Sequence, residues 1–154
     1  MYNLILGDCL KEMQNIPDGS VDMILCDPPY GTTACKWDSI IPFEPMWEQL
    51  NRIVKEDGAV CFFGAQPFTS ALICSNIKKF KHHWIWKKNR GTGFQVAKYR
   101  PMMATEDVIV FSVGKKKSII IRRCRNLKSR IFAETQVLLM EQTRWHILTM
   151  AGNG

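Results

Sequence analysis

With 154 residues, of which 46% are apolar, the chain has the length and the material of one folded domain. No apolar run approaches the roughly 18 residues that a membrane helix requires. The N-terminus MYNLILGDCL also lacks the basic start and the cleavage site of a signal peptide, so we expect a cytoplasmic protein with no membrane partner. The net charge of +7 is uneven: residues 1–114 hold 12 Lys and Arg against 12 Asp and Glu, and residues 115–154 hold 9 against 2.

Short apolar runs alternate with helical patterns in the first half of the chain, which is typical of a sheet built from βαβ units. Residues 4–6 are a candidate strand, and residues 10–15 a short helix that Pro17 stops. Residues 21–26 (VDMILC) predict a buried strand, entered through a turn at Asp18 and Gly19. This strand leads directly into the sequence DPPYG.

A longer helix is predicted from Phe43 onward. Apolar residues at positions 43, 46, 47, 50, 53 and 54 have the spacing of one helical face, with Pro45 in the first turn and Gly58 as the C-terminal stop. Residues 59–63 (AVCFF) then predict a second core strand, and the turn at residues 64–67 opens another helix through about Ser75.

Two further strands are predicted at residues 82–86 (HHWIW) and 108–112 (VIVFS). Because Trp84 and Trp86 alternate along the first of them, we expect one to lie in the core. Residues 89–105 are rich in Gly, Lys and Arg and lack periodicity, so they predict a long loop, of a kind that is usually functional or mobile.

The strand that ends in DPPY carries the chemistry. In an open α/β sheet, ligands bind at the carboxyl ends of the strands. Pro28 and Pro29 fix φ and remove two N–H donors, so the local carbonyl groups are rigid, unpaired acceptors. Asp27 and the Pro28 carbonyl can each accept one N–H bond from the amino group of adenine or cytosine. The amino nitrogen is a poor nucleophile, and these two hydrogen bonds increase its electron density. Tyr30 offers a face for an extruded base. The alternative is an ordinary strand-to-turn exit.

Two stretches around these features resemble one enzyme family in order and spacing. They are NLILGDCLKEMQNIPDGSVDMILCDPPYGTTACKWD at residues 3–38 and WIWKKNRGTGFQVAKYRPMMATEDVIVF at residues 84–111. They resemble the N6-adenine/N4-cytosine DNA methyltransferases, in particular the short phage-type members in which the catalytic motif precedes the cofactor motif. The resemblance, which spans residues 3 to about 113, implies an α/β fold with a Rossmann-like S-adenosylmethionine-dependent sheet. It also implies site-specific methylation of double-stranded DNA through a flipped base, as in restriction-modification.

The resemblance also implies roles for individual residues. It assigns catalysis to Asp27, Pro28, Pro29 and Tyr30, and an aspartate at position 27 favours adenine N6 over cytosine N4. It places three residues beside the adenosyl group of the cofactor: Gly7, Asp8 and Cys9. Asp8 can instead simply cap the helix that follows. Five cations flank the glycine-rich segment and can neutralise DNA phosphates, although a solvated loop explains them equally well: Lys87, Lys88, Arg90, Lys98 and Arg100.

The second half of the family pattern is missing. In this group a D-P-F-x-G-x-G-like turn follows the catalytic half and approaches the cofactor closely, and residues up to 154 contain none. We therefore predict an incomplete sheet, with a catalytic half at residues 1–113 and a basic, non-native tail at residues 114–154. Such a chain is expected to be inactive and to leave an exposed strand edge.

The sequence of the tail indicates how this segment arose. The stretch SIIIRRCRNLKSRIFAETQ has no family likeness. One back-translation of residues 118–154, read two nucleotides later, gives Y-x-P-Q-M and A-Y-P features that the family shows at this point. We interpret the tail as a frameshift product, which sequencing of the encoding DNA tests.

Other functions stay open at this stage. A small basic nucleic-acid-binding protein would have the tail as its working part, and deletion of residues 115–154 would then abolish its affinity for DNA. An RNA or protein methyltransferase with a related N-P-P-Y or D-P-P-Y turn is a further alternative. The oligomeric state has no signature in the sequence. Six scattered cysteines, without a C-x-x-C pair, predict neither a metal site nor a disulfide framework: Cys9, Cys26, Cys35, Cys61, Cys74 and Cys124.

Overall fold

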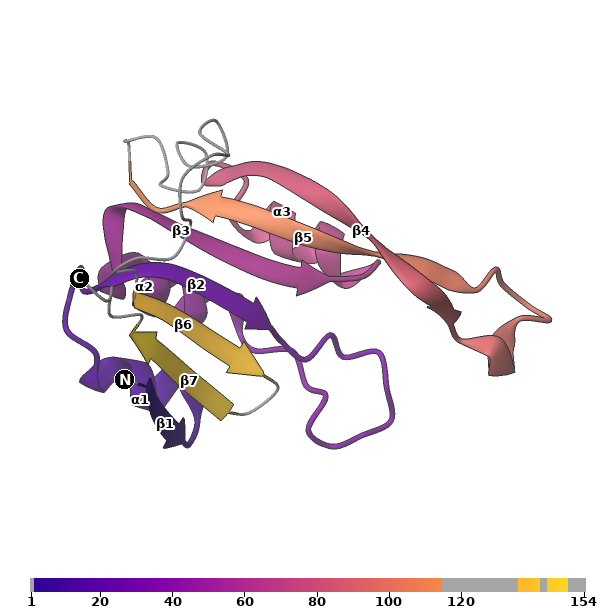
Figure 1. Ribbon diagram of the computed structural model, residues 1–154, viewed down its shortest axis with the longest axis horizontal. Coiled ribbons are helices and arrows are strands. Elements are labelled where there is room, and N and C mark those ends of the chain that lie inside the picture. Colours follow the sequence, from indigo (N-terminus) through magenta and orange to yellow (C-terminus); the bar gives the residue numbers. More distant parts are fainter. Residues whose placement is uncertain (1, 115–135, 142–143, 150–154) are drawn as a thin grey trace.

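The computed structural model describes residues 2–114, 136–141 and 144–149. Within these residues a seven-stranded sheet has the order β1-β7-β6-β2-β3-β5-β4 (Figure 1). Its strands are β1 (Tyr2–Leu6), β2 (Val21–Asp27), β3 (Val54–Gly64), β4 (Phe80–Thr92), β5 (Met103–Ser112), β6 (Gln136–Glu141) and β7 (Arg144–Thr149). The helical elements are α1 (Cys9–Glu12), η1 (Met13–Asn15), α2 (Phe43–Ile53), α3 (Phe68–Ser75) and η2 (Phe94–Val96).

The centre of the sheet is a parallel pair joined by a helix. β2 and β3 run parallel, with Ile24 opposite Val60 and Cys26 opposite Phe62. The carboxyl ends of both strands therefore lie at the same edge of the sheet. The chain crosses from one strand to the other through α2, so the predicted α/β alternation is confirmed in this part of the chain.

The core lies between the sheet and the helices, which pack on one of its faces (Figure 1). α2 buries Trp47, whose ring contacts Phe62 with centroids 5.8 Å apart and Phe111 with centroids 4.7 Å apart. Leu72 of α3 and Ile24 of β2 are also almost fully buried in this cluster. The apolar faces predicted for the first half of the chain thus meet in one core, which fixes the carboxyl ends of β2 and β3.

The predicted end of the long helix and the predicted start of the strand after it are both wrong, since α2 ends at Ile53 and β3 begins at Val54. The long helix ends at Ile53 and not at Gly58, because Val54 is already extended and pairs with Val21 of β2. The register then moves to Met23 opposite Ala59, so β3 has an irregularity before its regular part. Gly58 lies in this irregularity, where a Cβ atom would come within 2.5 Å of Val54 Cγ1.

The predicted loop at residues 89–105 is strand at both of its ends, and residues 93–102 between them are loop with the short helix η2. β4 continues to Thr92, which lies opposite Met103 of β5, and in Figure 1 the two ends project from the body of the sheet as an arm. β4 is an edge strand with most side chains exposed, and its extension at residues 87–92 has no apolar alternation for sequence analysis to find. For the same reason neither tryptophan lies in the core: Trp84 is 43% exposed and Trp86 is 53% exposed.

The tail adds two strands to the other side of the sheet. β6 runs parallel to β2, with Leu25 opposite Leu139, and β7 pairs with both β6 and β1. β2 is therefore paired on both sides, and the expectation of an exposed edge there is wrong. The predicted division at residue 113 and the frameshift stay predictions. Among the described residues, no helix is long and apolar enough to cross a membrane.

Candidate functional site

The DPPY segment lies where the sequence predicts it, at the carboxyl end of β2. Asp27 is the last residue of the strand and is exposed, whereas Pro28 and Pro29 are buried. The Tyr30 hydroxyl donates a hydrogen bond to Asp27 Oδ1 over 2.6 Å. All four residues line one cavity of about 140 Å³, which Trp37 also lines. The structure therefore brings the predicted catalytic residues together around one hollow.

One face of the Tyr30 ring packs against a neighbouring aromatic ring. Its ring stacks on Phe68 of α3, with centroids 5.1 Å apart and an interplanar angle of 26°. Burial, followed by the hydrogen bond to Asp27, raises the pKa of Tyr30 well above its usual range. The phenol stays protonated at neutral pH and acts as a donor to the carboxylate. One oxygen of Asp27 and one face of the Tyr30 ring are thus already engaged.

A second aspartate, which sequence analysis missed, shapes the loop around the cavity. Asp38 is buried and accepts three backbone N–H bonds, from Gly31 at 2.8 Å, Thr32 at 2.9 Å and Thr33 at 2.6 Å. The Thr33 hydroxyl, and then these backbone donors, lower the pKa of Asp38 to about 2. The only signal in the sequence is an aspartate a short distance after a glycine turn, a pattern common in loops.

Gly31 fits this loop for a conformational reason. Its φ of +67° lies in the left-handed region that favours glycine, and a Cβ atom there would come within 2.9 Å of Ile40 Cγ1. The turn after Tyr30 can therefore fold back toward Asp38. Trp37, beside this aspartate, is 47% exposed and lines the catalytic cavity.

The three residues predicted to contact the cofactor lie where β1 leads into α1: Gly7 and Asp8 join the two elements, and Cys9 is the first residue of α1. Asp8 is the N-cap of α1, and its carboxylate accepts from Leu10 N at 3.0 Å and Lys11 N at 3.3 Å, so the predicted cap is confirmed. Cys9 packs near Cys26, and burial raises the pKa of the Cys9 thiol to about 11. Their roles at a cofactor stay predictions.

The cavity beside Cys9 is small. The cavity that Cys9 lines has a volume of only about 10 Å³, whereas small-molecule sites usually measure roughly 300–1,000 Å³. A Cβ atom on Gly7 would come within 2.5 Å of Glu12 Oε1, so the side chain of Glu12 occupies the space beside this glycine.

The five predicted DNA-binding cations lie on the arm or at its base, in two different settings. Lys88 forms an ion pair with Glu106, and each of the two side chains is 19% exposed. The other four are exposed: Lys87, Arg90, Lys98 and Arg100. Phe94 and Tyr99 near the tip are 70% and 89% exposed. The arm therefore presents cations interleaved with aromatic rings, and its role in DNA binding stays a prediction.

Comparison with known proteins identifies the family. A family model described as DNA methylase, of the N6/N4 type, matches residues 21–147. The chain therefore belongs to the N6-adenine/N4-cytosine DNA methyltransferase family. It is 26% identical over 127 residues to the Type II methyltransferase M.HpaI of Haemophilus parainfluenzae, a match that covers 74% of this chain and 40% of that protein.

Two solved structures show the same fold. The PvuII DNA methyltransferase, which is cytosine-N4-specific, superposes with a TM-score of 0.59 at 15% identity, over 87% of this chain and 55% of that one. A Thermus thermophilus protein in complex with S-adenosyl-L-methionine gives a TM-score of 0.51 at 17% identity, over 77% of this chain and 59% of that one. The predicted fold class, an incomplete Rossmann-like methyltransferase sheet, is confirmed. The chain spans less than half the length of M.HpaI.

Proposed function

We propose that this chain supplies the part of a DNA amino-methyltransferase that grips the target base, with adenine N6 as the preferred amine. The observation that carries the proposal is the position of Asp27. Its carboxylate stands at the carboxyl end of a parallel strand, lines a cavity of about 140 Å³, and is oriented by the Tyr30 hydroxyl. Such a site offers fixed acceptors to an N–H donor.

The amine is held by two acceptors. Asp27 Oδ2 accepts one N–H bond and the Pro28 carbonyl accepts the other, while Asp27 Oδ1 stays hydrogen-bonded to the Tyr30 hydroxyl. These bonds direct electron density onto the nitrogen and set the direction of its lone pair. The base stacks on the face of the Tyr30 ring opposite Phe68, and that phenylalanine stops the ring from swinging away.

The remaining parts of the reaction are proposed from the family. Double-stranded DNA with an extruded base is the substrate, and the exposed cations of the arm contact its phosphates. S-adenosylmethionine is the methyl donor, and Gly7, Asp8 and Cys9, at the beginning of α1, lie beside its adenosyl group. We further propose that the 154 residues by themselves transfer no detectable methyl group, since the glycine-rich cofactor turn is not among them.

The proposal is tested by removing the amino group from the base. Duplex DNA with one mispaired adenine is compared with the same duplex carrying purine, which lacks the 6-amino group. We expect the chain to bind the adenine duplex about tenfold more tightly, because two hydrogen bonds are lost with purine. Asp27→Ala is expected to bind both duplexes equally. Fluorescence anisotropy with labelled DNA measures the four affinities.

Two controls sharpen this test. Asp27→Asn keeps an acceptor oxygen at the same place and should retain part of the preference. Mispaired cytosine, compared with its analogue without the 4-amino group, tests the alternative target. A larger amino-group preference for cytosine would contradict the assignment to adenine, and equal binding of adenine and purine by the unmodified chain would contradict the proposal as a whole.

A separate prediction concerns the Tyr30 hydroxyl. Tyr30→Phe keeps the ring on Phe68 but loses the hydrogen bond to Asp27 Oδ1, so the carboxylate is free to rotate. We expect the adenine preference to fall about three- to tenfold, which is the range for the loss of one ordinary hydrogen bond. Tyr30→Ala should also lower the affinity for the purine duplex, because the stacking surface is lost. An unchanged adenine preference in Tyr30→Phe would show that the hydroxyl does not position Asp27, and equal affinities of the two variants for the purine duplex would show that the ring does not stack on the base.

A further inference from the structure

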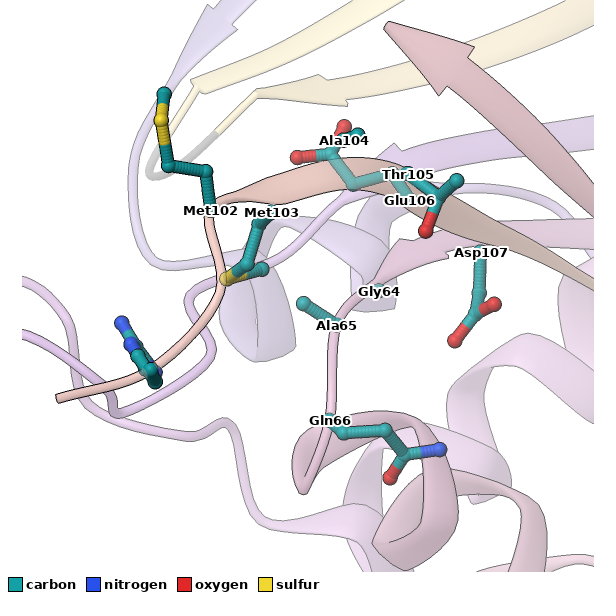
Figure 2. A pocket seen from close by; sticks show the side chains of 10 residues that line it. Gly64, Ala65, Gln66, Met102, Met103, Ala104, Thr105, Glu106 and Asp107 are labelled. Carbon is teal, nitrogen blue, oxygen red and sulfur yellow. The ribbon is translucent and has the colours of Figure 1, made fainter. Parts of the chain in front are cut away.

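A second and larger cavity lies beside the catalytic one. It has a volume of about 430 Å³ and lies between the turn that follows β3 and the beginning of β5 (Figure 2). Figure 2 shows the Gln66 side chain on the turn before α3 and the Asp107 side chain on β5, with Ala65 and Met103 also lining the cavity. Arg100 also lines the cavity.

The polar groups of this cavity are held in fixed orientations. Asp107 Oδ2 accepts a hydrogen bond of 2.8 Å from the hydroxyl of Thr69, a buried residue of α3. Gln66 Oε1 accepts a hydrogen bond of 2.8 Å from the Ser70 hydroxyl, so its amide nitrogen is left as a donor. The cavity therefore presents a carboxylate acceptor from β5 and an amide donor from the turn before α3, and neighbouring hydroxyl groups of α3 orient both.

The charges in the cavity favour a neutral ligand. Glu106 is paired with Lys88, which leaves the Asp107 carboxylate and the Arg100 guanidinium as one negative and one positive group. A phosphate would be repelled by the carboxylate. A nucleobase edge, with donors and acceptors side by side, matches both charged groups without bringing a charge of its own.

The two cavities are close enough to serve one strand of nucleic acid. Thr69, which fixes Asp107, follows Phe68, which supports the Tyr30 ring. The Glu106 carboxylate is also one of the groups that raise the pKa of Tyr30. A base in the larger cavity would therefore be a near neighbour of the extruded target base.

We propose that this cavity binds a guanine next to the target base, a specificity site that rests on the proposed function. Guanine presents two adjacent N–H groups to one carboxylate, here Asp107, and its O6 and N7 acceptors suit a guanidinium, here Arg100. The amide nitrogen of Gln66 donates to the remaining lone pair of O6. Adenine, cytosine and thymine each lack part of this pattern.

The test uses the 154-residue chain and short labelled oligothymidines. Each carries one adenine, flanked on its 5′ or 3′ side by guanine, adenine, cytosine or thymine. We expect the guanine oligonucleotide to bind about tenfold more tightly than the others in one of the two orientations. Arg100→Gln and Asp107→Asn should each reduce this preference to less than about twofold.

Lys98→Gln is the matched control. Its side chain is exposed on the same arm but does not line the cavity, so it should weaken all oligonucleotides equally and keep the guanine preference. Arg100 is exposed, so its variant tests the site even if Asp107→Asn lowers stability. Absence of a preference, a preference for another base, or a guanine preference that survives Arg100→Gln would overturn the proposal.

Asp27→Ala separates this inference from the proposed function. It should remove the discrimination between adenine and purine and leave the guanine preference in place. If only the guanine preference is absent, the specificity site is wrong and the catalytic proposal stands. If the unmodified chain does not distinguish adenine from purine, the catalytic proposal fails, whatever the guanine result.

Discussion

Replacing Asp38 by alanine is expected to release the loop around the catalytic cavity and to abolish the preference for mispaired adenine. The three N–H groups of Gly31, Thr32 and Thr33 would lose the common acceptor that holds the loop in its turn. Trp37, beside Asp38, would lose its fixed position at the cavity. Affinity for the adenine and purine duplexes measures the loss, and circular dichroism checks that the sheet remains.

Asp38→Asn is the matched variant, because it keeps one acceptor oxygen and nearly the same volume. We expect it to retain part of the adenine preference. If Asp38→Ala had the same preference for the adenine duplex over the purine duplex as the unmodified chain, the loop would have no part in shaping the site.

The same residue predicts a pH dependence of stability. The pKa of Asp38 is about 2 in the folded chain and roughly 4 for an ordinary aspartate. Its carboxylate therefore stabilises the fold above about pH 4, and this contribution is lost as the pH falls from about 4 toward about 2. The difference in Tm between the unmodified chain and Asp38→Asn should shrink across this interval. A constant difference would contradict the assignment.

Replacing Phe111 by alanine is expected to lower the free energy of unfolding by about 3–5 kcal/mol. Phe111 is fully buried in β5, and its ring contacts those of Trp47, Phe62 and Phe80 at centroid distances of 4.7, 6.2 and 6.0 Å. The loss approaches the whole stability of a small domain. Urea denaturation followed by tryptophan fluorescence measures it.

Phe94→Ala is the control for this prediction, since Phe94 is 70% exposed near the tip of the arm. Its effect on stability should lie within about 0.5 kcal/mol. Equal effects of the two substitutions would show that Phe111 does not lie in the core.

The parts of the fold that were predicted correctly have strong local patterns. The apolar spacing from Phe43 predicted α2, and the continuous apolar run after Gly58 predicted the regular part of β3. The arm was missed because β4 exposes most of its side chains, so alternation is absent even though the backbone pairs with β5. Periodicity reports burial, and an exposed edge strand has little of it.

The position of the proposed catalytic residues could be predicted because Asp27 to Tyr30 are consecutive and follow an apolar strand. The contacts that shape the site could not be predicted from the sequence. Phe68 reaches the Tyr30 ring from a helix 38 residues later in the chain, and Asp38 acts through backbone groups that have no sequence signature. Asp107 meets Thr69 only because β5 returns beside β3.

Capture of an exocyclic amine by Asp27 is tested most directly by NMR. Adenine labelled with 15N at its amino group is placed at a mispaired position in duplex DNA, and its amino protons are followed as the chain is added. We predict a downfield shift of these protons with the unmodified chain and none with Asp27→Ala, because the shift reports a hydrogen bond to the carboxylate. Amino protons that do not shift with the unmodified chain, or that shift equally with both, would contradict the account.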